Sequence, residues 1–124
     1  MEHRTRSTAS DVLEWIHAFC VVPIGADQGK RVKLTIAQRE AVRRALGPDT
    51  EFQILDPALR AYLTLAWLCG PLARGQIRRL DSMDPLIVWA AAGPEIRTVL
   101  ERDDDGVIVC PRYGTRHPAV TQGA

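Results

Sequence analysis

One apolar segment, residues 57–69 (PALRAYLTLAWLC), constrains the fold more than any other part of the chain. Asp56 can accept hydrogen bonds from the free amides at a helix start, and Pro57 suits the first helical position because it has no amide to leave unpaired. Gly70 and Pro71 end the pattern. The apolar side chains cover more than one face of such a helix, and they are Leu59, Tyr62, Leu63, Leu65, Ala66, Trp67 and Leu68. We therefore expect a central helix packed on several sides.

Further helix signals flank this segment. A first helix is predicted to begin near Ser10 or Asp11 and to end before Pro23. Thr35 and Gln38 have the spacing of a capping box, which predicts a second helix up to Gly47. Its predicted apolar face comprises Ile36, Ala37, Ala41, Val42, Ala45 and Leu46.

Pro and Gly divide the second half of the chain into shorter helices. Asp84 and Pro85 repeat the helix-opening signal, and the Gly93-Pro94 pair interrupts the helix before residues 94–103 resume it. Residues 72–83 give a weaker signal for one more short helix. Val107, Ile108 and Val109 suit a short strand that could pair with residues after Gly114.

These signals predict a mainly α fold. We expect a compact bundle of about five helices with a short β-hairpin or irregular C-terminal appendage. A chain of 124 residues fits one hydrophobic core. The expected organisation is a polar N-terminal tail over residues 1–9, a helical domain over residues 10–102, and a short strand and turn with a C-terminal tail over residues 103–124.

Composition argues against a membrane-spanning or secreted protein. The longest strongly apolar stretch, residues 63–72, has about half the length that a bilayer span requires. The polar N-terminus lacks the apolar region of a secretory signal, so we expect a cytoplasmic protein without a membrane partner. The odd, widely spaced set of Cys20, Cys69 and Cys110 predicts reduced, structural cysteines.

Residues 23–40, PIGADQGKRVKLTIAQRE, resemble a phosphate-binding loop at first sight. Such a loop requires four residues between its glycines and Ser or Thr after the lysine, because the backbone amides wrap the phosphates and the hydroxyl binds magnesium. Here only three residues separate Gly25 from Gly29, and Arg31 follows Lys30. The segment also follows a predicted helix rather than a strand. We therefore expect a basic loop with no nucleotide site.

Other catalytic or metal-binding patterns are incomplete. Cys110 begins a stretch similar to a zinc knuckle, but Tyr113 occupies the position of the second thiolate and His117 adds at most one ligand. The three histidines have no visible Ser, Cys or carboxylate partner for nucleophilic catalysis. The sequence therefore predicts no catalytic residue, no cofactor and no metal.

Local charge is more informative than the net charge of +1. Residues 28–46 contain six basic residues and one acidic residue, Glu40, which gives this segment a net charge of +5. A loop and helix could present these side chains to the phosphates of duplex DNA, with Arg78 and Arg79 as an extension. A solvated helix face explains the same cluster, and both interpretations stay open. The candidate nucleic-acid-binding residues are Lys30, Arg31, Lys33, Arg39, Arg43 and Arg44.

Residues 12–46 also resemble the N-terminal region of terminase large subunits from tailed phages and prophages. That region has an aromatic helix, a V-P-x-G segment, G-K-x-x-x-L and a Q-R pair. A weaker likeness follows at LTLAWLCGPLAR, similar to the helix after the family's ATP-binding loop. The matching positions are Trp15, Phe19, Pro23, Gly25, Gly29, Lys30, Leu34, Gln38 and Arg39.

The resemblance implies a role in DNA packaging, which in the family is driven by an ATPase domain and a nuclease domain. In the family, the glutamine that matches Gln38 lies near the adenine. Residues 44–61 of this chain contain no Gly-Lys-Thr loop, and the sequence ends before a nuclease could begin. We therefore expect a small, non-catalytic, terminase-like protein of phage or prophage origin.

Two functional expectations follow. The first is DNA binding in packaging or a related transaction, with duplex DNA and other phage packaging proteins as partners. The alternative is a protein-protein interaction module or homo-oligomeric adaptor that binds no nucleic acid. An inactive remnant is a third possibility.

Overall fold

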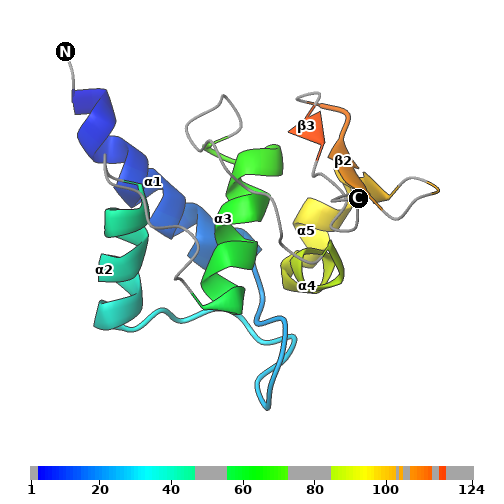
Figure 1. Ribbon diagram of the computed structural model, residues 1–124, viewed down its shortest axis with the longest axis horizontal. Coiled ribbons are helices and arrows are strands. Elements are labelled where there is room, and N and C mark those ends of the chain that lie inside the picture. Colours follow the sequence, from blue (N-terminus) through cyan, green and yellow to red (C-terminus); the bar gives the residue numbers. More distant parts are fainter. Residues whose placement is uncertain are drawn as a thin grey trace, which may run out of the picture.

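The protein is mainly α-helical, as its sequence predicts (Figure 1). The computed structural model describes residues 3–46, 56–72, 85–102, 104, 107–112 and 115–116. Within these ranges lie five helices followed by a small antiparallel sheet. No helix there combines the length and apolar character that crossing a membrane requires. The described part of the C-terminal appendage forms this sheet.

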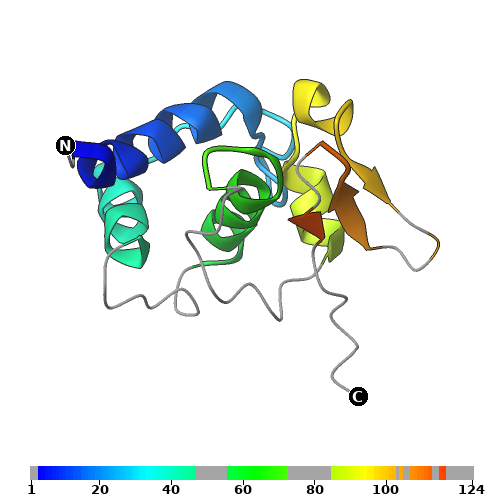
Figure 2. The same cartoon turned by 90° about the horizontal axis from the view of Figure 1, so that it is seen from above.

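Helix α3 (Pro57–Cys69) lies at the centre of the molecule, as predicted (Figures 1 and 2). Six consecutive residues, 61–66, are buried. Because successive helical residues turn by about 100°, six of them point in every direction around the axis. Such a helix is stable only when neighbours cover all its sides, and α1 (His3–Phe19) and α4 (Pro85–Ala91) pack against two of them.

The start of α3 follows the sequence signal. The Asp56 carboxylate Oδ1 accepts a hydrogen bond of 2.9 Å from the amide of Leu59, and Pro57 occupies the first turn. One polar side chain is buried inside the helix, and it is satisfied locally because the Thr64 hydroxyl donates to the carbonyl of Arg60 at 2.8 Å. The core therefore accommodates this hydroxyl without an unpaired donor.

Helix α1 is longer than its sequence predicts. It begins at His3, whereas a start at Ser10 or Asp11 was expected, so that boundary is wrong. Residues 3–9 contain neither Gly nor Pro, and a helix already anchored by packing extends at little cost through such residues. Its buried side chains, Val12, Leu13 and Ile16, recur at helical spacing and face the core.

Helix α2 (Ile36–Ala45) begins with the predicted capping box. The Thr35 hydroxyl accepts from the amide of Gln38 at 3.1 Å, and the Gln38 side chain accepts from the amide of Thr35 at 2.9 Å. The predicted apolar face is narrower than expected. Val42 and Ala45 are buried, but Ile36 is 78% exposed because it lies on the opposite side of the helix.

The helix predicted over residues 94–103 is wrong in length. Helix α5 (Pro94–Arg97) has a single turn. The amides of Thr98 and Val99 donate to carbonyls three residues earlier, and the Thr98 hydroxyl donates to the carbonyl of Glu95 at 2.6 Å. These bonds tighten the last turn and end the helix.

The sheet has the order β1-β2-β3, with both strand pairs antiparallel. The strand predicted at residues 107–109 corresponds to β2 (Ile108–Cys110), and its partner after Gly114 is β3 (Thr115–Arg116). Strand β1 (Glu101–Arg102) replaces the predicted end of a helix. The helix predicted over residues 72–83 lies, after Leu72, outside the described residues.

A backbone junction connects the end of α1 to the link between α4 and α5. Cys20 and Ala92 form an antiparallel bridge, and the amide of Val21 donates to the carbonyl of Ala91 at 2.9 Å. The amide of Gly93 donates to the carbonyl of Phe19 at 3.0 Å. A Cβ atom at Gly93 would lie 2.4 Å from that carbonyl oxygen, so only glycine fits here.

We expect Gly93→Ala to lower the free energy of unfolding by about 1–3 kcal/mol, because the methyl group forces the junction apart. Urea denaturation measures the change. Glu95→Ala is the control, since Glu95 is exposed two residues from Gly93 and its change should stay within about 0.5 kcal/mol. Equal stability of Gly93→Ala and the unmodified protein would contradict the junction's role.

Candidate nucleic-acid interface

The segment that resembles a phosphate-binding loop forms a hydrogen-bonded hairpin over residues 21–31 that projects from the helices (Figure 1). Val21 and Arg31 form an antiparallel bridge at its base. The amide of Val22 donates to the carbonyl of Lys30 at 2.9 Å, and the amide of Gly29 donates to the carbonyl of Val22 at 2.8 Å. Gly25 and Gly29 have φ angles of 99° and 88°, which glycine adopts without strain. The predicted basic loop is thus held by its own backbone hydrogen bonds.

The backbone amides of this hairpin are already occupied. Gln28 donates to the carbonyl of Gly25 at 3.1 Å, and Lys30 donates to that of Asp27 at 2.9 Å. With the amide of Gly29 also used, the amides around the Gly-Lys pair do not converge on a ligand. A phosphate cradle requires such amides to be free, so the hairpin geometry agrees with the spacing argument against one.

Arg31 has a structural role at the end of α1. Its guanidinium Nη1 donates to the carbonyls of His17 and Ala18, both at 3.2 Å. The amide of Leu34 donates to the His17 imidazole Nε2 at 3.3 Å. A positive side chain at a helix C-terminus also interacts favourably with the helix dipole. His17 and Arg31 together fix the strand-like residues 31–34 against α1, a role of His17 that its position in the sequence does not reveal.

Two of the six candidate basic residues have acidic neighbours. The Lys30 ammonium lies 3.4 Å from the Asp27 carboxylate at the tip of the hairpin, and the Arg43 guanidinium lies 3.2 Å from that of Glu40. Both pairs are solvent-exposed, and exposed pairs contribute little stability. Either cation can therefore exchange its local partner for a phosphate.

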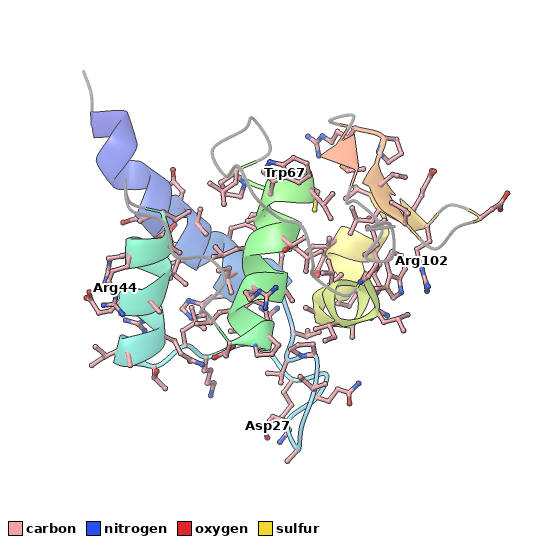
Figure 3. All side chains as sticks on the ribbon, in the orientation of Figure 1. Asp27, Arg44, Trp67 and Arg102 are labelled. Carbon is pink, nitrogen blue, oxygen red and sulfur yellow. The ribbon has the colours of Figure 1, made fainter. Side chains whose placement is uncertain are left out.

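Lys33, Arg39 and Arg44 make no ion pair within the described parts of the chain, and all three are exposed. Arg39 and Arg44 lie on α2, and Arg44 extends from its outer side in Figure 3. Lys33 precedes the helix between the buried residues Val32 and Leu34, so its side chain faces solvent. We call Arg39, Arg43 and Arg44 the α2 arginine face.

The structure thus divides the six predicted residues by role. Lys33, Arg39 and Arg44 are available to a ligand, Lys30 and Arg43 are available after their exposed pairs open, and Arg31 is held by α1. Arg78 and Arg79, the predicted extension, lie outside the described residues. The sequence could not show this division because the contacts of Arg31 join residues 13 and 14 positions apart.

The three cysteine thiols are free, and they are buried or half-buried. Burial raises the pKa of the Cys69 thiol to about 12, with a further increase from Cys110 and a partial offset from Arg112. Burial, with a smaller contribution from Cys69, also raises the pKa of Cys20 far above its usual range. Thiols of this kind are poor nucleophiles because the thiolate is rare at neutral pH.

Within the described ranges, no three His, Cys, Asp or Glu side chains are arranged to hold a metal ion. Tyr113 and His117, which were considered with Cys110, lie outside those ranges. Comparisons of the chain with protein-family models, curated proteins and solved structures found no match. The geometry of the basic residues is therefore the basis for a functional proposal.

We expect Arg31→Gln to lower the free energy of unfolding by about 1 kcal/mol, because the last carbonyls of α1 lose a charged donor. Lys33→Gln is the matched control, since it removes the same charge two residues away and Lys33 makes no side-chain hydrogen bond to the described residues. Its effect should stay within about 0.5 kcal/mol. Equal effects of the two substitutions on urea denaturation would show that Arg31 has no special structural role.

Proposed function

We propose that this chain binds duplex DNA without catalysing a reaction, through the α2 arginine face together with Lys33 and Lys30. In this proposal it is a small, terminase-like protein of phage or prophage origin that acts in DNA packaging or a related DNA transaction. The cytoplasm is the compartment that such a role requires. Other packaging proteins would be its protein partners.

The observation that carries the proposal is the availability of Arg39 and Arg44. Both guanidiniums are exposed on a capped helix and make no ion pair within the described residues. If the arginines served only to keep this helix face in solvent, pairing them with nearby carboxylates would stabilise the helix, as the pair of Arg43 with Glu40 does. Unpaired arginines on a rigid element are suited to phosphate, since the planar guanidinium binds it through two hydrogen bonds.

The spacing of these residues is compatible with a DNA backbone. Arg39 and Arg43 lie one helical turn apart, which is about 6 Å along the axis. Successive phosphates of one strand advance by about 3.4 Å along the axis of duplex DNA, so phosphates two positions apart advance by about 7 Å. The helix can therefore present its arginines to phosphates two positions apart while Lys33 and Lys30 reach further along the strand.

Charge predicts that the interaction is non-specific and salt-dependent. The whole chain has a net charge of only +1, whereas residues 28–46 have +5, so the attraction comes from one surface. If about four phosphates are neutralised, the affinity should fall with salt with a logarithmic slope of roughly −3 to −4. The proposal does not include recognition of a base sequence.

The resemblance of residues 12–46 to terminase large subunits supports the packaging context. Three of the matching positions, Lys30, Gln38 and Arg39, lie in or beside the proposed interface. Gln38 acts here in the capping box of α2, which is a different role from an adenine contact. The chain would thus share the entry segment of the motor and use it to contact DNA without ATP.

A second candidate function is a homo-oligomeric or protein-binding adaptor. Two large apolar side chains, Ile36 on α2 and Leu86 on α4, are 78% and 62% exposed and could each take part in such a contact. Light scattering at low and high protein concentration distinguishes the states. A strict monomer would exclude the homo-oligomer.

DNA binding can be tested by fluorescence anisotropy with a labelled 20-base-pair duplex at low salt. We expect Arg39→Gln with Arg44→Gln to weaken binding about tenfold or more and to reduce the salt slope by about two, because two phosphate contacts are lost. Arg97→Gln with Arg102→Gln is the matched control, because it removes the same charge from another surface.

Two results would contradict the proposal. One is the absence of binding by the unmodified protein at micromolar concentration. The other is equal weakening by the two double variants, which would reduce the α2 arginine face to an ordinary charged surface.

A further inference from the structure

A second group of basic residues surrounds Trp89 on α4. The guanidinium carbon Cζ of Arg97 lies 5.5 Å from the centre of the Trp89 ring, and that of Arg102 lies 5.6 Å from it. Both distances are within the range of cation–π contacts. Three different elements, α4, α5 and β1, thus bring two arginines to one aromatic ring.

Each of the two arginines is fixed by its own element. The Arg97 guanidinium Nη2 donates to the carbonyl of Trp89 at 3.1 Å, which holds it at the end of α4. Arg102 belongs to β1, which pairs with β2 at Ile108. Trp89 is half-buried and packs against the core, which restricts the motion of its ring. The Arg97 guanidinium and the backbone of Arg102 are therefore held in place before any ligand arrives.

The charges of this group are not compensated by ion pairs. Neither arginine makes a salt bridge within the described residues, although Glu95 and Glu101 are near in sequence. In a strand, adjacent side chains point to opposite faces, which separates Glu101 from Arg102. Two cations beside one ring favour an anionic ligand.

An exposed apolar side chain lies beside Trp89 on α4. Leu86 precedes Trp89 by three residues on α4, so the two side chains are neighbours on the helix surface, and Leu86 is 62% exposed. A bare phosphate gains nothing from such a neighbour. A ligand that combines carboxylates with an apolar side chain would use both features.

The location separates this group from the proposed DNA interface. Arg44 and Arg102 lie at opposite ends of the molecule in Figure 3, and Figure 2 shows α2 and α5 at opposite ends as well. The two groups of arginines therefore belong to different surfaces of the protein. The sequence could not reveal the group, because Arg97 and Arg102 are separated from Trp89 by a helix end and a turn.

We propose that Leu86, Trp89, Arg97 and Arg102 form a docking site for an acidic segment of a partner protein. Carboxylates of the segment bind the two guanidiniums, and an apolar side chain between them packs on Leu86 and the edge of Trp89. If the α2 arginine face binds DNA, the chain would connect this partner to the duplex. The docking site itself does not depend on DNA binding.

The site can be tested by NMR titration with the blocked peptide Glu-Glu-Leu-Glu-Glu. Its readouts are the indole N–H of Trp89 and the Nε–H signals of Arg97 and Arg102. We expect saturable shifts of these three signals. Arg102→Gln should weaken the binding about tenfold, because one charge-assisted contact is lost. Arg39→Gln with Arg44→Gln should leave it unchanged.

The apolar contact can be tested separately with Glu-Glu-Ser-Glu-Glu. We expect the serine peptide to bind a few-fold more weakly than the leucine peptide, since it loses one apolar contact. Leu86→Ser should weaken the leucine peptide and leave the serine peptide unchanged. Equal weakening of both peptides would contradict the contact with Leu86.

Three results would overturn the docking site. The first is the absence of saturable shifts with the leucine peptide at millimolar concentration. The second is an equal response of Arg39 and Arg44, which would indicate unselective charge attraction. The third is that inorganic phosphate or a 20-base-pair duplex shifts the Trp89 and Arg102 signals at lower concentration than the peptide, which would assign the group to phosphate.

Discussion

The burial of α3 on all sides organises this protein. Residues 61–66 point in every direction around the helix axis and all are buried, so neighbouring elements must surround them. Helix α1 covers one side and α4 another, and the backbone junction at Cys20, Ala92 and Gly93 fixes these two helices relative to each other. As a result α2 and the sheet lie at opposite ends of the molecule, each with one surface in solvent (Figure 2).

This arrangement gives the two basic groups different neighbours. The α2 arginine face projects from a helix that buries mainly Val42 and Ala45, so its outer side is polar and suited to phosphates. The group at Trp89 combines guanidiniums with an aromatic ring and Leu86, and is better suited to an amphipathic acidic segment. In both proposals the charged side chains extend from helices or strands that are already folded, because a side chain on an ordered element loses less freedom on binding.

The sequence predicts the parts of the fold that depend on local chemistry. The caps at Thr35 and Asp56, the breaks at Gly70 and Gly93 and the strand at Ile108 follow from hydrogen bonding and backbone freedom within a few residues. The start of α1, the early end of α5 and the strand at Glu101 depend on packing and on competing turn bonds, so local signals missed them. For the predicted interface, the charge of the side chains is enough to predict that they are exposed. The ion pair of Lys30 and the structural role of Arg31 depend on how the backbone folds, so the sequence could not show them.

The most direct test of the proposed interface is to map it residue by residue. Amide chemical-shift changes should be recorded while a 20-base-pair duplex is added at low salt. The account predicts that the shifts concentrate in residues 30–44 and that Trp89, Arg97 and Arg102 remain unaffected. Shifts centred on Trp89, or spread evenly over the exposed arginines, would contradict a DNA contact specific to the α2 arginine face.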